Sequence, residues 1–104
     1  MNISIAIPPK EIETFCRKWR IVELSLFGSV LRDDFHPNSD VDVLVSFSPE
    51  ADWGLLDHED MEEELTTILG RKVDLVTRRS VERSTNRPRR EAILSTTETI
   101  YAEG

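Results

Sequence analysis

The spacing of apolar positions changes several times along the chain, as it does when helices and strands alternate. Steps of three and four predict helices over 9–20, 55–69 and 88–94, with shorter helical turns over 30–32 and 80–83. Alternating or continuous apolar runs predict strands over 22–27, 40–47 and 72–77, and a short edge strand over 99–102. We therefore expect an α/β (α+β) fold, in which helices cover one face of a small, mixed, twisted sheet of three to four strands.

Length and composition fit one small globular domain. The chain has 104 residues, 38% of them hydrophobic and 32% charged, which leaves room for one core, so residues 1–104 are treated as a single domain. Cys16 is the only cysteine, which excludes an internal disulfide and a cysteine-rich zinc site. No apolar run approaches the roughly 18 residues of a membrane span, and no basic region marks a secretion signal. We expect a cytoplasmic protein without a membrane segment.

Charge is distributed unevenly along the chain. The formal net charge is −7, and residues 1–70 hold 5 basic against 15 acidic side chains, whereas residues 71–90 hold 8 against 2. The overall negative charge argues against direct nucleic-acid binding, which needs a positive surface. The basic stretch Arg71–Arg90 has two interpretations: a solvated helix face, or a surface that faces phosphates or an acidic partner.

Two carboxylates alternate with the apolar positions of the second predicted strand. Asp40 and Asp42 project from the face opposite Val41 and Val43. At about 4 to 7 Å such a pair repels by roughly 1 to 4 kcal/mol, and a divalent cation with a preference for oxygen ligands, Mg²⁺ or Mn²⁺, relieves that cost. Asp74 lies close to both if its predicted strand, 72–77, is the neighbour of the strand over 40–47. The competing interpretation is that the acidic pair only protects a strand edge against aggregation.

A turn suited to an anion follows the first predicted strand. Gly28 allows close backbone approach, and Ser29 begins the helical turn behind it, so that free N–H groups and a hydroxyl face a phosphate. Phosphate-binding and metal-binding features therefore occur in one short segment of sequence.

Other candidates are weaker. His36 lies in a predicted turn without a nearby set of ligands, and His58 with Glu62 offers two metal ligands where a structural zinc site needs four. The aromatic side chains form no array on which bases of a single-stranded nucleic acid could stack: Trp19, Trp53 and Tyr101.

The order and spacing of these motifs resemble a known superfamily. The segment Leu26–Ser29, ten further residues, and then Asp40–Val45 resemble the Gly-Ser…Asp-x-Asp signature of polymerase-β-like nucleotidyltransferases. Leu69–Val76 is similar to the third-acid segment of the smallest members, the minimal nucleotidyltransferase (MNT) antitoxins that pair with HEPN-domain ribonuclease toxins. Arg32 also matches the pattern.

The resemblance implies a function and a set of site residues. It implies a protein adenylyltransferase that transfers AMP from ATP to a tyrosine of the cognate HEPN toxin. Asp40, Asp42 and Asp74 would be catalytic and hold two Mg²⁺ ions, with Mn²⁺ possible, and the nucleotide would be bound by Gly28, Ser29 and Arg32.

Two other functions remain open at this stage. One is an antitoxin that neutralises its toxin by binding alone. The other is nucleotidyl transfer to an RNA or a small molecule, against which stands the lack of room for an acceptor-binding domain.

Overall fold

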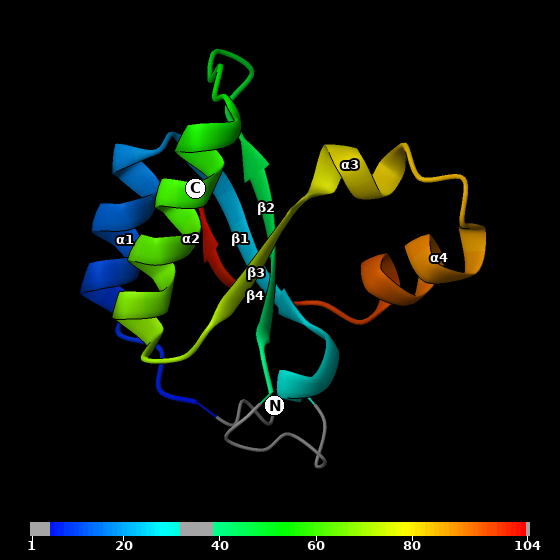
Figure 1. The fold of residues 1–104 in the computed structure, drawn as a ribbon, viewed down its shortest axis with the longest axis horizontal. Coiled ribbons are helices and arrows are strands. Elements are labelled where there is room, and N and C mark those ends of the chain that lie inside the picture. Colours follow the sequence, from blue (N-terminus) through cyan, green and yellow to red (C-terminus); the bar gives the residue numbers. More distant parts are fainter. Residues whose placement is uncertain (1–4, 32–38, 104) are drawn as a thin grey trace.

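The computed structural model describes residues 5–31 and 39–103 and contains one mixed four-stranded sheet (Figure 1). The strand order is β3-β2-β1-β4. In chain order the elements are α1 (Pro9–Lys18), β1 (Ile21–Phe27), the 3₁₀ helix η1 (Gly28–Leu31), β2 (Val41–Phe47), α2 (Leu55–Leu69), β3 (Val73–Thr77), α3 (Arg78–Glu82), α4 (Arg87–Ser95) and β4 (Glu98–Ala102). The predicted α/β fold with a mixed sheet is confirmed.

Strand pairing explains how the sheet is connected. β1 pairs antiparallel with β2 and with β4, whereas β2 and β3 are parallel. Parallel neighbours need a long crossover, and α2 provides it between β2 and β3. β3 and β4 are left at the two edges of the sheet.

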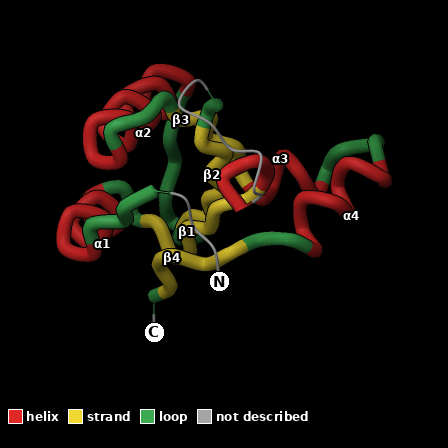
Figure 2. The backbone as a smooth tube through the Cα atoms, turned by 90° about the horizontal axis from the view of Figure 1, so that it is seen from below, coloured by secondary structure: helices red, strands yellow, loops and turns green. Residues whose placement is uncertain are grey.

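Helices α1 and α2 lie side by side on one face of the sheet (Figures 1 and 2). The valines of β2 point toward them and are fully buried, together with Met61 and Leu65 of α2 and Phe15 of α1. An ion pair of 2.9 Å between Lys18 and Glu64 joins the two helices at the surface. This packing is the main hydrophobic core of the molecule.

Helices α3 and α4 lie on the opposite side of the sheet, where no helix was expected (Figure 2). Val81 of α3 and Ile93 of α4 form a second, smaller buried cluster with Phe27 and Leu44. Since α3 and α4 carry only one buried apolar side chain each, sequence periodicity gave little sign of this second layer. The prediction of helices on one face only was therefore wrong.

Several element boundaries differ from the predicted ones. α1 ends at Lys18 rather than at residue 20, because the backbone of Arg20 turns to a positive φ of 56°. α3 begins directly after β3, where the Thr77 hydroxyl accepts a hydrogen bond from Ser80 N–H at 3.1 Å. In the described part of the chain, no helix is long and apolar enough to cross a membrane.

Candidate functional site

The turn after β1 brings the backbone of Gly28 against a carboxylate of β2. Gly28 has a φ of +76°, which L side chains rarely adopt. A Cβ at this position would overlap the Asp42 side chain, and the strand register likewise places Phe27 opposite Asp42. Both the backbone and the neighbouring carboxylate therefore require glycine here.

Asp42 and Asp74 are partners in the parallel register of β2 and β3. Asp42 alternates with the buried valines of β2, and Asp74 lies between the buried Val73 and Leu75 of β3. Because successive side chains of a strand point to opposite faces, both carboxylates lie on the face opposite α1 and α2. Neighbouring strands are about 4.8 Å apart. The structure thus brings two of the three predicted carboxylates together beside Gly28.

Asp40 does not lie on the strand as predicted. β2 begins at Val41, whose N–H donates to the Lys72 carbonyl at 2.9 Å, and Asp40 is exposed just before it. Among residues 5–31 and 39–103, no three His, Cys, Asp or Glu side chains are arranged to hold a metal ion. Asp40 is therefore not gathered with Asp42 and Asp74 into a complete ligand set.

The donor chemistry of Asp42 and Asp74 nevertheless fits a hard divalent cation. Mg²⁺ is commonly held by one or two protein carboxylates, with water and substrate phosphate completing the shell. Ser29, the second residue of η1, is half-buried and follows the glycine that contacts Asp42. Two predicted candidates, Arg32 and His36, lie outside the described residues.

A groove of about 670 Å³ runs along β3, and Asp74 lies in its wall. Apolar and aromatic side chains form one part of the lining, while Thr77, Ser80 and Arg89 form another. Gly28, Ser29 and Asp42 are not part of its lining, so the groove is a separate hollow that adjoins the carboxylate pair only at Asp74.

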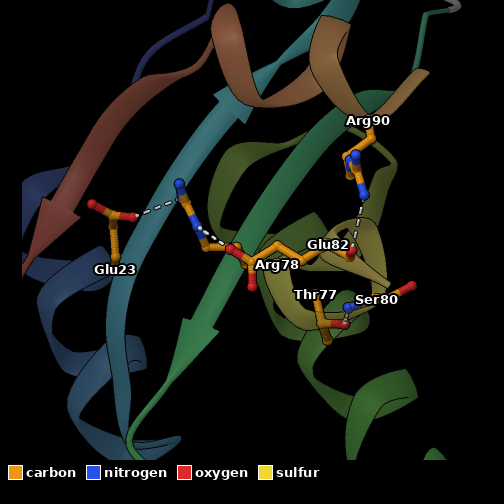
Figure 3. A network of polar contacts seen from close by, with 6 residues as sticks. All are labelled: Glu23, Thr77, Arg78, Ser80, Glu82 and Arg90. Atoms are coloured by element: carbon orange, nitrogen blue, oxygen red, sulfur yellow. Dashed lines mark hydrogen bonds and ion pairs between the residues drawn. The ribbon is translucent and has the colours of Figure 1, made fainter. Parts of the chain in front are cut away.

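The basic stretch is divided between ion pairs and a free surface. Arg78 reaches across the sheet to Glu23 at 3.4 Å and also contacts Glu82 at 3.6 Å, which ties the start of α3 to β1 (Figure 3). Arg83, Arg87 and Arg89 are exposed and make no ion pair with any described residue. A second cavity, of about 410 Å³, is lined by Arg83, Arg89 and Arg90 between α3 and α4.

His58 and Glu62 have a role that the sequence did not reveal. The Glu62 carboxylate accepts a hydrogen bond from the Leu75 N–H at 2.8 Å, and His58 Nε2 lies 2.8 Å from the Leu75 carbonyl oxygen. Their i, i+4 spacing was visible, but only the packing of α2 beside β3 shows what they contact.

Cys16 is a core residue rather than a nucleophile. Its side chain is completely buried, and burial raises the pKa of its thiol to about 12, so the reactive thiolate is suppressed.

Relatives of this chain are known from sequence comparison. Protein adenylyltransferase MntA of Thermococcus cleftensis is 39% identical over 64 residues, which are 62% of this chain and 63% of that protein. The chain therefore spans less than two thirds of the length of this curated relative.

Solved structures share the fold. A chain of a toxin–antitoxin crystal structure with AMP-PNP matches with a TM-score of 0.68 at 21% identity, covering 90% of this chain and 73% of that chain. A chain from the complex of tri-AMPylated Shewanella oneidensis HEPN toxin with MNT antitoxin matches with a TM-score of 0.59 at 19% identity, covering 90% and 69%.

At the level of the family, sequence and fold agree. A model described as a nucleotidyltransferase domain matches residues 9–98, a range that includes Gly28, Asp42 and Asp74. This chain belongs to the nucleotidyltransferase domain family.

Proposed function

We propose that this protein is an Mg²⁺-dependent adenylyltransferase that transfers AMP from ATP to a tyrosine of a HEPN-domain toxin and so acts as its antitoxin. The observation that carries this proposal is the contact of Gly28 with Asp42, which is itself in register with Asp74. Support for the acceptor comes from relatives: one is named a protein adenylyltransferase, and one solved complex contains an AMPylated HEPN toxin.

The nucleotide would be held at the end of β1. The backbone N–H groups of Gly28 and Ser29, together with the Ser29 hydroxyl, would face the β- and γ-phosphates, and Arg32 would add a positive charge. A tight glycine turn suits this task because the phosphate can approach the backbone closely.

Three carboxylates would organise the reacting atoms. Asp42 and Asp74 would hold two Mg²⁺ or Mn²⁺ ions, and Asp40, which is exposed just before β2 and apart from them, would have to move toward them when the ions bind. The ions would supply charge neutralisation at the α-phosphate and the leaving group. The phenolic oxygen of the acceptor forms a bond to the α-phosphorus, while the bond from that phosphorus to the bridging oxygen breaks and pyrophosphate leaves.

Asp74 has a second task in this scheme. A tyrosine has an unperturbed pKa near 10, so only about one in a thousand is ionised at pH 7. Asp74, exposed on the groove, would assist removal of the phenolic proton as the new bond forms.

Intact-mass spectrometry tests the proposal. The chain is incubated with a candidate HEPN-domain toxin, ATP and Mg²⁺, and the toxin should gain the mass of one or more AMP units on tyrosine. Asp42→Asn should abolish the gain, whereas Asp60→Asn, an exposed acid on α2, should leave it unchanged. Equal neutralisation of the toxin by the unaltered chain and Asp42→Asn, without any mass gain, would instead establish an antitoxin that acts by binding alone.

A further inference from the structure

Three side chains on one face of α2 contact the backbone of the edge strand β3. Glu62 accepts from the Leu75 N–H at 2.8 Å, His58 Nε2 lies 2.8 Å from the Leu75 carbonyl, and the Thr66 hydroxyl accepts from the Val73 N–H at 3.2 Å. They are spaced four residues apart, so they follow one another along a single helix face. We name His58, Glu62 and Thr66 the α2 clamp.

The α2 clamp provides hydrogen-bond partners for backbone groups of β3 that a further strand would otherwise pair. β3 is the last strand on its side of the sheet, and an edge strand leaves every second N–H and carbonyl without a ladder partner. Leu75 directs both groups outward, and α2 satisfies both. The bond to Glu62 involves an ionised carboxylate and is therefore stronger than a bond between neutral groups.

The contacts of the clamp fall on both sides of Asp74. Val73 and Leu75 are held by α2, while Asp74 between them faces Asp42 across the β2–β3 pairing. Among the described residues, the Asp74 carboxylate makes no hydrogen bond or ion pair of its own. Its position is consequently set by the backbone, and the backbone at this edge is set by α2.

We infer that Glu62, with His58 and Thr66, is a positioning residue that fixes the Asp74 carboxylate relative to Asp42. This inference rests on the proposed function, because it assigns to Asp74 a part in holding the metal–nucleotide complex. It also assigns a task to two residues that the sequence alone suggested only as a weak metal pair.

The hydrogen-bond geometry argues against metal binding by that pair. A carbonyl oxygen only accepts hydrogen bonds, so the His58 Nε2 that faces it carries the hydrogen and offers no lone pair to a metal. The Glu62 carboxylate lies 3.8 Å from the same nitrogen and is already bonded to the Leu75 N–H.

Two measurements on the isolated chain test the inference. Hydrogen exchange followed by NMR reports the Leu75 amide directly, and titration with Mn²⁺ and AMP-PNP, followed by water-proton relaxation, reports the assembled site without any acceptor. The variants are Glu62→Ala, Glu62→Gln, Asp74→Asn and the double variant Glu62→Ala/Asp74→Asn. Glu63→Ala is the matched control because Glu63 is exposed on the same helix.

In Glu62→Ala, loss of a charge-assisted hydrogen bond should speed exchange of the Leu75 amide about tenfold and weaken Mn²⁺·AMP-PNP binding by about the same factor. Glu62→Gln keeps an acceptor oxygen and should restore most of both, and Glu63→Ala should change neither. The double variant should bind no more weakly than Asp74→Asn alone, because both changes act through one carboxylate.

Additive losses in the double variant would overturn the inference, since they would show that Glu62 acts independently of Asp74. Unchanged Mn²⁺·AMP-PNP binding in Glu62→Ala, with the Leu75 amide exposed, would overturn it as well. If the unaltered chain fails to bind Mn²⁺·AMP-PNP, the proposed function itself fails, and the role assigned to Asp74 fails with it.

Discussion

The two faces of the sheet differ although the same strands form both. On the face covered by α1 and α2, β2 contributes Val41, Val43 and Val45, all fully buried in one continuous core. On the other face the same strand contributes Asp42 and Leu44, and α3 and α4 provide only a small cluster. One face is thus built for stability, and the other keeps polar groups accessible at some cost in packing.

The largest expected effect is on AMP transfer, which we assign to the face of the sheet that carries Asp42. Asp42→Asn should lower AMP transfer by at least about a hundredfold, since a single group that stabilises transition-state charge is commonly worth that much. The free energy of unfolding in metal-free buffer should stay the same or rise, because a repulsion with Asp74 is removed. Transfer assays and urea denaturation of the same preparation measure both. A marked loss of stability with transfer retained would make Asp42 a structural residue.

On the covered face the reverse is expected. Leu65→Ala removes a fully buried side chain of α2 and should lower the free energy of unfolding by about 2 to 5 kcal/mol. Below the unfolding transition, Mn²⁺·AMP-PNP affinity should fall only slightly. Denaturant titration, with Leu55→Ala as the control because Leu55 is 76% exposed, checks the expected contrast.

Gly28→Ala should lower both the stability of the fold and the affinity for the nucleotide, because Gly28 directly follows β1 and lies against Asp42. The positive φ costs about 1 to 2 kcal/mol for a residue with a Cβ, and the added methyl must displace the Asp42 carboxylate. We expect lower stability together with a loss of nucleotide binding, measured by thermal unfolding and calorimetric titration with AMP-PNP. Gly54→Ala is the control, since a Cβ there meets an atom no closer than 3.9 Å. Unchanged binding in Gly28→Ala would place the phosphates elsewhere.

Binding of the proposed toxin partner gives a further test of the face covered by α3 and α4. Exchanging Arg83, Arg87 and Arg90 for Glu should weaken toxin binding about tenfold or more, because arginines are frequent contributors to binding energy at interfaces. AMP-PNP binding by the isolated chain should be retained. The control exchanges Lys10, Arg17 and Arg20 for Glu; these residues are exposed on or just after α1, and the exchange makes the same change in net charge. Normal toxin modification by the Arg83, Arg87 and Arg90 variant would direct attention to the acidic helix α2 instead.

The smallest effect concerns Cys16 in the covered core. Burial raises the pKa of its thiol from the ordinary value of 9.0 to about 12, because the charged thiolate is disfavoured away from water. The unfolded chain therefore loses this proton first, and the contribution to stability disappears as the pH rises from 9 toward 12. The native protein should resist alkylation by iodoacetamide at pH 8.5, and Cys16→Ala should show a shallower fall in stability over this range. Rapid alkylation of the native chain would contradict the assigned burial.

Much of the fold and part of the candidate site were predictable from sequence. The alternation of Asp42 with Val41 and Val43 indicated two faces of one strand, and local spacing is sufficient for such a prediction. The start of β2 after Asp40, by contrast, depends on pairing with the segment at Lys72, which lies more than thirty residues away. The clamp was hidden for the same reason: Glu62 looked like one more glutamate of a solvated helix until α2 was placed beside β3.

The tryptophan pair gives this molecule an internal spectroscopic reporter. Trp19 and Trp53 are the only two indoles in the chain, and they pack edge to face with centroids 5.2 Å apart and planes at 78°. Trp53 also donates to the Trp19 carbonyl at 2.8 Å. The pair lies near the beginning of β1, and Gly28 follows its end. Near-ultraviolet circular dichroism of the coupled rings should therefore follow global unfolding, while substitutions at Gly28 or Ser29 should leave the signal of the folded state unchanged.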